Sequence, residues 1–290
     1  MFTPASIYDV FMQSQYWLSG QLHEFQASQL EQLLRHARRT VPFYAQRIEH
    51  MFRADGSINW DRWTDTPILT RLEVAENFTA LLSTDLPANH GRTIEETTSG
   101  STGLPVRIRS SSLNGFAAVA ADWRGQRWWN FDWSKTMVHW HSWNESFERH
   151  GTHRSYGPWG SPSEAVSLAG EIYAADRDAP LDQRLEHLKR HDASYLGAMG
   201  NNPFAVALEL IRRQQTLSLQ GIMSWSVSVD ASFRSAARKA FGSPVHAIYS
   251  AKEGCRMAYT SADGSHYHIC ADMVLFEILG VQSRHLMDWI

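Results

Sequence analysis

Apolar residues recur at helical spacing early in the chain. Between Phe25 and Arg39 they predict an amphipathic helix that ends before Pro42, because proline lacks the donor a helix interior needs; the positions are Leu30, Leu33, Leu34 and Ala37. Further along, Thr70 is suited to cap a short helix through Val74. We therefore expect a mainly helical segment over residues 1–90.

After Gly91 the pattern alternates between short β-rich runs and helical spacing, which predicts an α/β core over residues 91–290. The expected helices are Ser112–Arg127, Leu181–Arg190, Phe204–Gln215 and Ser232–Phe241, the last with Arg234, Arg238 and Lys239 exposed. The expected strands are Thr93–Ser101, Pro105–Arg109, Lys135–Trp143, Gly221–Val229, Val245–Tyr249, Met257–Thr260 and Tyr267–Leu279, with Tyr195–Met199 lying between two helices.

Composition narrows the classes of function. The 290 residues carry 27 basic and 30 acidic side chains, a net charge of −3, so no strong field attracts nucleic acid or an anionic membrane. Only Cys255 and Cys270 are present, which favours a reducing compartment. No run reaches the roughly 18 apolar residues of a membrane span, and the start does not resemble a signal peptide. A cytoplasmic protein with a small-molecule partner is expected.

One segment has the chemistry of a phosphate cradle. Its glycines let backbone N–H groups turn inward, and hydroxyl donors surround them: Thr97, Thr98, Ser99, Gly100, Ser101, Thr102, Gly103, Leu104 and Pro105. No lysine follows the last glycine, so this is not the P-loop of kinases and GTPases. An ordinary hairpin turn is the alternative, but the length of the string and the closing proline favour phosphate binding.

Together with four other segments, this loop resembles the adenylate-forming superfamily, in particular its phenylacetate:CoA ligase-like branch. The segments are Leu30–Tyr44 with its Val-Pro-Phe-Tyr end, Pro67–Arg71, and Tyr249–Glu253 followed by His266–Ile278. The resemblance implies the large N-terminal core of such an enzyme. It also implies ATP-dependent activation of a carboxylic acid, aryl or otherwise hydrophobic, to an acyl-adenylate, usually followed by transfer to CoA.

The resemblance also implies roles for single residues. Glu253 would help to hold Mg²⁺, and Tyr249 would pack beside the adenine or the acyl-adenylate. Thr98, Ser99, Ser101 and Thr102 would bind the β- and γ-phosphates of ATP; with Glu253, Thr98 is the expected catalytic residue.

Three features depart from the family pattern. Trp225, Ser226 and Val227 stand where the branch carries Gly-x-Glu near the adenine. The cysteines and nearby histidines do not have the spacing of a zinc site, so no structural zinc is expected. No lysine follows Lys252, so the family's C-terminal lid domain with its catalytic lysine is not expected in this sequence. Nucleotide affinity and turnover are therefore expected to be reduced.

The region after the loop is rich in aromatic residues. Trp140 and Tyr195 are predicted to line the acid pocket, while most of the tryptophans there are expected to form the core and its rim. His139 and His141 lie on one side of a strand; with His153 they are candidates to contact the substrate carboxylate, although structural roles are favoured.

The sequence leaves three interpretations open. The chain is an acid-activating enzyme, with a lid supplied by a protein partner; or it is a truncated, non-catalytic relative that binds a ligand or another protein; or it is a fragment of a longer gene. A homodimer is also expected, because a chain that ends inside a sheet exposes an edge.

Overall fold

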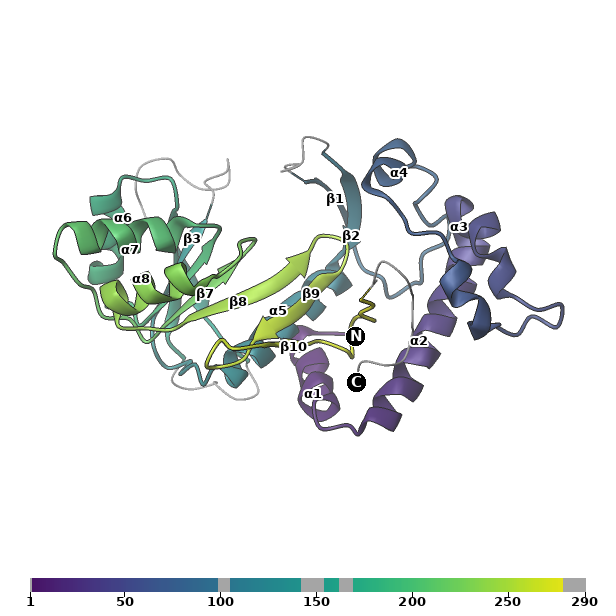
Figure 1. The fold of residues 1–290 in the computed structure, drawn as a ribbon, viewed down its shortest axis with the longest axis horizontal. Helices are drawn as coiled ribbons and strands as arrows, with labels where there is room; N and C mark the ends of the chain where they lie inside the picture. The colour runs from purple at the N-terminus through teal and green to yellow at the C-terminus, as the bar shows by residue number, and fades with distance from the viewer. Residues whose placement is uncertain (1, 99–104, 142–153, 162–168, 279–290) are drawn as a thin grey trace. The chain divides into compact units, whose positions relative to one another are not determined.

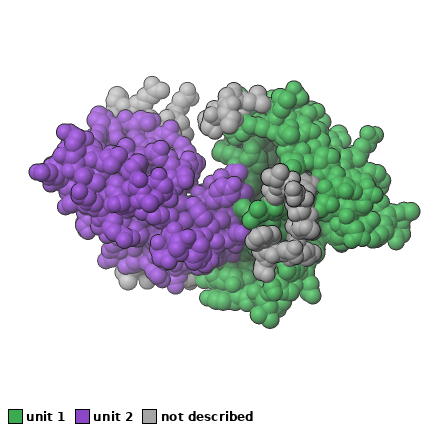
Figure 2. All heavy atoms as spheres, in the orientation of Figure 1, with its two compact units in different colours: residues 1–119, 252–255, 271–290 green, residues 120–251, 256–270 purple. Residues whose placement is uncertain are grey.

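The computed structural model of the chain describes residues 2–98, 105–141, 154–161 and 169–278. It divides into two compact units, the first made of residues 1–119, 252–255 and 271–290 and the second of residues 120–251 and 256–270 (Figure 2). The expectation that the α/β core begins after residue 90 stays a prediction.

The first unit begins with helices, and a β-hairpin follows them (Figure 1). The helices are α1 (Pro4–Ser14), α2 (Ser19–Thr40), α3 (Pro42–Arg47) and α4 (Arg71–Glu76), with 3₁₀ helices η1 (Glu49–Met51) and η2 (Trp60–Asp65). Strands β1 (Thr93–Thr97) and β2 (Arg107–Ser111) pair antiparallel, and α5 (Ser112–Trp128) follows at once.

Helix α2 covers a small core in the first unit. Leu34 is buried in it with Ile48, Met51 and Ile58, whereas Leu33, predicted to be on the same apolar face, is 60% exposed. The helix begins six residues earlier than Phe25 and ends at Thr40, and Pro42 starts α3 at a position where its missing N–H costs nothing.

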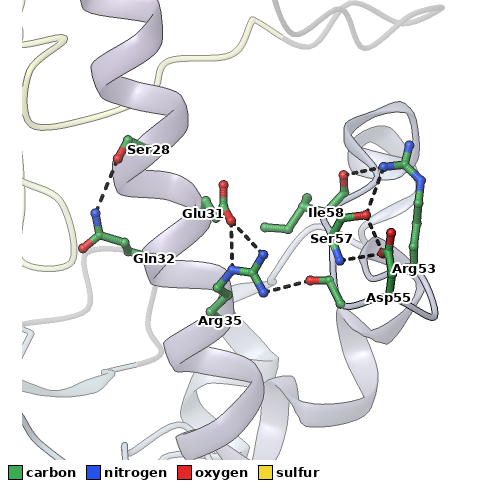
Figure 3. A network of polar contacts seen from close by, with 9 residues as sticks. Ser28, Glu31, Gln32, Arg35, Arg53, Asp55, Ser57 and Ile58 are labelled. Atoms are coloured by element: carbon green, nitrogen blue, oxygen red, sulfur yellow. Dashed lines mark hydrogen bonds and ion pairs between the residues drawn. The ribbon is translucent and has the colours of Figure 1, made fainter.

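Polar contacts fix the loop between η1 and η2 against α2. Arg35 donates to Glu31 Oε1 and to the carbonyl of Gly56, and Arg53 donates to the carbonyl of Ile58 (Figure 3). Asp55 accepts hydrogen bonds from the backbone N–H and hydroxyl of Ser57. Side-chain hydrogen bonds therefore hold this turn, in addition to the burial of Ile58.

The second unit is built on a mostly parallel sheet. In the described part of the chain it has eight strands in the order β10-β9-β8-β7-β6-β3-β5-β4, and neighbours from β5 through β8 run parallel. The strands are β3 (Met137–His141), β4 (Arg154–Pro158), β5 (Glu171–Asp176), β6 (Tyr195–Met199), β7 (Gly221–Trp225), β8 (Val245–Ala251), β9 (Cys255–Thr260) and β10 (Tyr267–Ile269).

Helices α6 (Leu181–Arg190), α7 (Asn202–Arg212) and α8 (Ala231–Phe241) pack on one face of this sheet (Figure 1). Their apolar sides meet alternate strand residues such as Val138, Trp140 and Leu196, which are all fully buried. The opposite face carries stacked aromatic rings: Phe131 on Tyr195, with ring centroids 4.3 Å apart, and Trp129 on His246, at 4.7 Å.

The expected helices after residue 91 are confirmed, as is the α/β class with a mostly parallel sheet. The core role expected of most tryptophans is confirmed for Trp129, Trp133 and Trp159, which are 6% exposed or less. Trp140, predicted to line the acid pocket, is fully buried in the core as well. Trp143 lies outside the described residues.

Two expectations near the C-terminal hairpin are wrong. The strand predicted for Tyr267–Leu279 ends at Ile269, because the following backbone belongs to the first unit, where Gln26 donates to the carbonyl of Ala271 at 2.8 Å. Arg234 is not fully exposed either: its guanidinium donates to the carbonyl of Val245 at 2.8 Å.

Candidate nucleotide site

The predicted phosphate loop joins strands β1 and β2 of the first unit. Thr97 pairs with Arg107 at the end of the ladder. Thr98 then closes the hairpin twice, since its backbone N–H donates to the carbonyl of Val106 at 2.9 Å and its hydroxyl oxygen accepts from the N–H of Val106 at 3.1 Å. The loop predictions for Ser99, Gly100, Ser101, Thr102 and Gly103 lie outside the described residues.

An arginine that the sequence analysis did not single out lies at the base of this loop. Arg71 donates from Nη2 to the hydroxyl oxygen of Thr98 at 3.1 Å. Arg71 is the first residue of α4, whose start is fixed by a capping box: Thr70 accepts from the N–H of Glu73, and Glu73 accepts from the N–H of Thr70. The signal was the position of Arg71 at the end of the Pro67–Arg71 motif.

Glu73 also anchors the helix at its other side. Its carboxylate accepts from Arg47 at 2.8 Å, and the hydrogen bonds from Thr70 and Arg47 lower the pKa of Glu73 to about 2. The carboxylate is therefore charged at neutral pH, and the segment that carries Arg71 is fixed on both sides.

The segment Lys252–Glu253 also belongs to the first unit, and it contacts strand β1. Lys252 Nζ lies 2.6 Å from Glu96 Oε1. Glu96 and Thr98 are two residues apart, so their side chains leave the extended chain on the same side. The contacts of Arg71 and Lys252 therefore reach neighbouring positions on one side of the hairpin.

The other side of the hairpin has a separate set of charges. Glu95 accepts from Arg107 at 2.9 Å and from Arg109 at 2.5 Å. The hydrogen bonds from Arg109, and then from Arg107, lower the pKa of Glu95. These arginines are engaged with Glu95 on the side away from Thr98.

The two ends of the Tyr249–Glu253 motif belong to different units. Glu253 is an exposed residue of the first unit. Tyr249 belongs to the second unit, where it follows the buried residues of β8, and it is 52% exposed. In the described part of the chain, no group of three or more His, Cys, Asp or Glu side chains forms a metal cluster.

The structure does not bring the two predicted pocket residues together. Strand β3 pairs with β6 in a register that places Met137 opposite Tyr195 and Trp140 opposite Ala198. Because side chains alternate, Tyr195 and Trp140 point to opposite faces of the sheet. Trp140 lies fully buried beneath the helices, and the hydroxyl of Tyr195 donates to Gln220 and accepts from the N–H of Asp132.

The histidines of β3 form a pair at the carboxyl end of the parallel strands. His139 Nδ1 and His141 Nε2 are 2.6 Å apart, and the ring of His139 meets that of Trp225 edge to face at 4.9 Å. Gly197 of the adjacent strand makes room for them, since a Cβ there would lie 2.8 Å from the His139 ring. His153 lies outside the described residues.

Burial affects the charge of both histidines. It lowers the pKa of His139 far below its ordinary value, with the nearby His141 and Arg256 acting in the same direction. Burial, and then Arg177, lowers the pKa of His141. The pair is therefore neutral at physiological pH. One ring donates to the other in their mutual contact, so the pair keeps one nitrogen that can accept a further hydrogen bond.

Trp225 and Ser226 stand at the same end of the sheet. Trp225 is half-buried, and Ser226 has a φ of 61°, the left-handed region that a non-glycine residue seldom adopts. The carboxyl end of a parallel sheet is where open α/β folds bind ligands. An indole thus occupies the position where the sequence analysis expected the family's glycine.

Comparisons with known proteins agree with the fold. No protein-family model matches the sequence, and no curated protein matches it. Among solved structures the chain is similar to 2-hydroxyisobutyryl-CoA ligase in complex with 2-HIB-AMP and CoA in the thioesterification state, with 14% identity and a TM-score of 0.61 over 86% of this chain and 53% of that one. The open conformation of that ligase gives 13% identity and a TM-score of 0.60 over 82% and 52%.

The postadenylation state of the same ligase, with 2-HIB-AMP, gives a TM-score of 0.60 over 83% of this chain. The chain thus spans about half the length of these ligases and has the α/β fold of their N-terminal core, as the sequence predicted. Among the described residues, no helix is long and apolar enough to cross a membrane.

Proposed function

We propose that the chain activates a carboxylic acid with ATP to give an acyl-adenylate and pyrophosphate, and that the thiol of CoA then takes the acyl group as a thioester and releases AMP. The observation that carries the proposal is the contact of Arg71 with Thr98. It puts a permanent cation at the base of a loop made of hydroxyl and glycine residues, and this combination suits the oxygens of a polyphosphate.

The residues present fit ATP and its metal ion. Glu253 offers an exposed carboxylate, the ligand type that Mg²⁺ takes together with water and phosphate oxygens. Bound there, Mg²⁺ would supply neutralising charge to the phosphates. In this proposal the loop residues Ser99 to Gly103 bind the β- and γ-phosphates, Arg71 positions Thr98, and Tyr249 packs beside the adenine.

The acid would bind at the carboxyl end of the parallel strands. There the ring of Trp225 offers an aromatic surface, and the neutral His139–His141 pair offers a hydrogen-bonding nitrogen. This combination suits an aryl or other hydrophobic acid. Membership of the phenylacetate:CoA ligase-like branch, a cytoplasmic location, and a homodimer or a lid-supplying protein partner are parts of the same proposal.

Acid-dependent exchange of labelled pyrophosphate into ATP tests this function. With a panel of aryl and fatty acids, we expect exchange by the unmodified chain and a loss of about tenfold or more in Arg71→Ala and Glu253→Ala. Arg109→Ala is the matched control, because it also removes an arginine that contacts strand β1, but through Glu95 instead of Thr98; its exchange should stay within about twofold. Absence of exchange with every acid would contradict the proposal.

A second function is favoured by Trp225. An indole at the expected adenine edge suits a relative that binds a ligand or a protein without turnover. Calorimetry separates the two: binding of an acid or ATP with no pyrophosphate formed supports the second function, whereas repeated turnover excludes it. Exchange that rises in Trp225→Gly would show that the indole restricts the nucleotide.

A further inference from the structure

We propose that a hollow on the helical part of the first unit binds a small phosphorylated molecule that carries a planar or apolar ring. The hollow has a volume of about 340 Å³ and is lined by Arg35, Arg38, Arg39 and Phe52. None of these residues belongs to the candidate nucleotide site, so this binding goes beyond the proposed function and does not depend on it.

Helical spacing brings the three arginines together. Arg35, Arg38 and Arg39 stand at positions i, i+3 and i+4 of α2, which share one side of a helix. Arg38 and Arg39 lie in the last turn, where a cation also stabilises the helix through its dipole. That stabilisation explains a basic last turn, but it does not require the three guanidinium groups to line a hollow.

Two of the arginines are held in position before any ligand arrives. Arg35 is fixed by Glu31, at 2.9 and 2.7 Å, and by the carbonyl of Gly56 at 2.8 Å (Figure 3). Arg38 is fixed by two hydrogen bonds to Glu49, at 2.7 and 2.6 Å. A ligand that meets these groups therefore costs little side-chain entropy.

Arg39 differs from its two neighbours. Its side chain is 72% exposed, and the nearest carboxylate oxygen, that of Asp85, is 3.8 Å away. Among the described residues its guanidinium makes no hydrogen bond to the protein, so its donors remain available. A guanidinium fork matches two oxygens of a phosphate, and Arg39 is therefore the residue that distinguishes an anion from a neutral ligand.

Phe52 is the apolar residue of the lining. Its ring is half-buried, and the guanidinium of Arg38 lies 4.3 Å from its centroid. An apolar wall beside fixed cations favours a phosphate joined to a ring over inorganic phosphate alone. Because Glu31 and Glu49 pair with two of the arginines and Asp85 lies 3.8 Å from the third, affinity should be modest and should fall with added salt.

Calorimetry on the whole chain at low salt, with phenyl phosphate as the probe, tests the inference. We expect saturable one-site binding that is weaker for inorganic phosphate and for phenol, and about tenfold weaker in Arg39→Ala. Arg62→Ala is the control, because it removes the same charge from an exposed arginine of the same unit that pairs with Asp65 instead; it should change affinity less than twofold.

Three results would overturn the inference: no binding of phenyl phosphate at low salt, equal losses in Arg39→Ala and Arg62→Ala, or equal affinity for inorganic phosphate. Loss of phenyl phosphate binding in Arg71→Ala would assign the probe to the nucleotide site and would also overturn it. Circular dichroism of each variant confirms that the fold is retained. Failure here leaves pyrophosphate exchange unaffected, so the two proposals fail separately.

Discussion

The polar groups of the two candidate regions, the hairpin of the first unit and the sheet of the second, lie in different environments. In the first unit, the pairs Lys252–Glu96 and Arg109–Glu95 are well exposed and join surface segments. In the second unit, His246 is buried and His139 is partly buried, and each has a ring nitrogen without a hydrogen-bond partner among the described residues. Charge contacts in the first unit should therefore affect binding more than stability, and buried groups in the second should dominate stability.

The largest effect is expected from the core of the second unit. Trp140→Ala should lower the free energy of unfolding by about 3–5 kcal/mol, because it removes a fully buried ring beneath the helices. Urea unfolding followed by circular dichroism measures this. Trp140→Phe should cost less, since the indole N–H has no partner among the described residues. Leu33→Ala, at an exposed position of the first unit, should change stability by less than about 0.5 kcal/mol; equal losses at the two positions would contradict the comparison.

The next effect is a dependence of stability on pH. Burial, and then Arg234, lowers the pKa of His246 to about 4, whereas the unfolded chain binds that proton near pH 6.5. Between these values the unfolded state holds more protons, so stability is complete above about pH 6.5 and falls as the pH approaches 4. The difference corresponds to about 3 kcal/mol.

His246→Phe, which keeps a ring to stack on Trp129, should flatten the stability profile between pH 4 and 6.5. His139 contributes with the same sign, so part of the slope should remain. The exposed His266 supplies the control, and His266→Gln should leave the profile as it is. Unfolding in urea at several pH values measures both, and an unchanged slope in His246→Phe would show that this histidine is not responsible.

Periodicity predicted much of the second unit. Helix α6 has the predicted bounds Leu181–Arg190, and the segment Tyr195–Met199 is strand β6, because both depend on local spacing of apolar residues. Register could not be predicted in this way. Whether Met137 or Val138 pairs with Tyr195 decides which residues share a face, and that choice placed Trp140 away from Tyr195.

The candidate site was harder to predict from the sequence than the fold. The motif Thr97–Pro105 predicted a loop between two strands, and the hairpin β1–β2 is present around it. The contact of Arg71 with Thr98 joins segments 27 positions apart, and no local pattern contains such a contact. The resemblance to ligases identified both segments, Pro67–Arg71 and Thr97–Pro105, but it did not predict that they contact each other.

The smallest effect on stability is expected from Lys252 and Glu96. Lys252→Met should cost at most about 1 kcal/mol, because both side chains are about half exposed and water screens the pair. The loss should shrink further in 1 M salt, where the screening length is about 3 Å. Glu96→Gln should give the same small loss. The double variant should lose less stability than the sum of the two single losses, because either change alone already breaks the pair. A cost well above 1 kcal/mol that persists in high salt would mean that this contact supports the hairpin as buried groups support the second unit. The contrast between the units would then fail at the point where the hairpin meets the segment that carries Glu253.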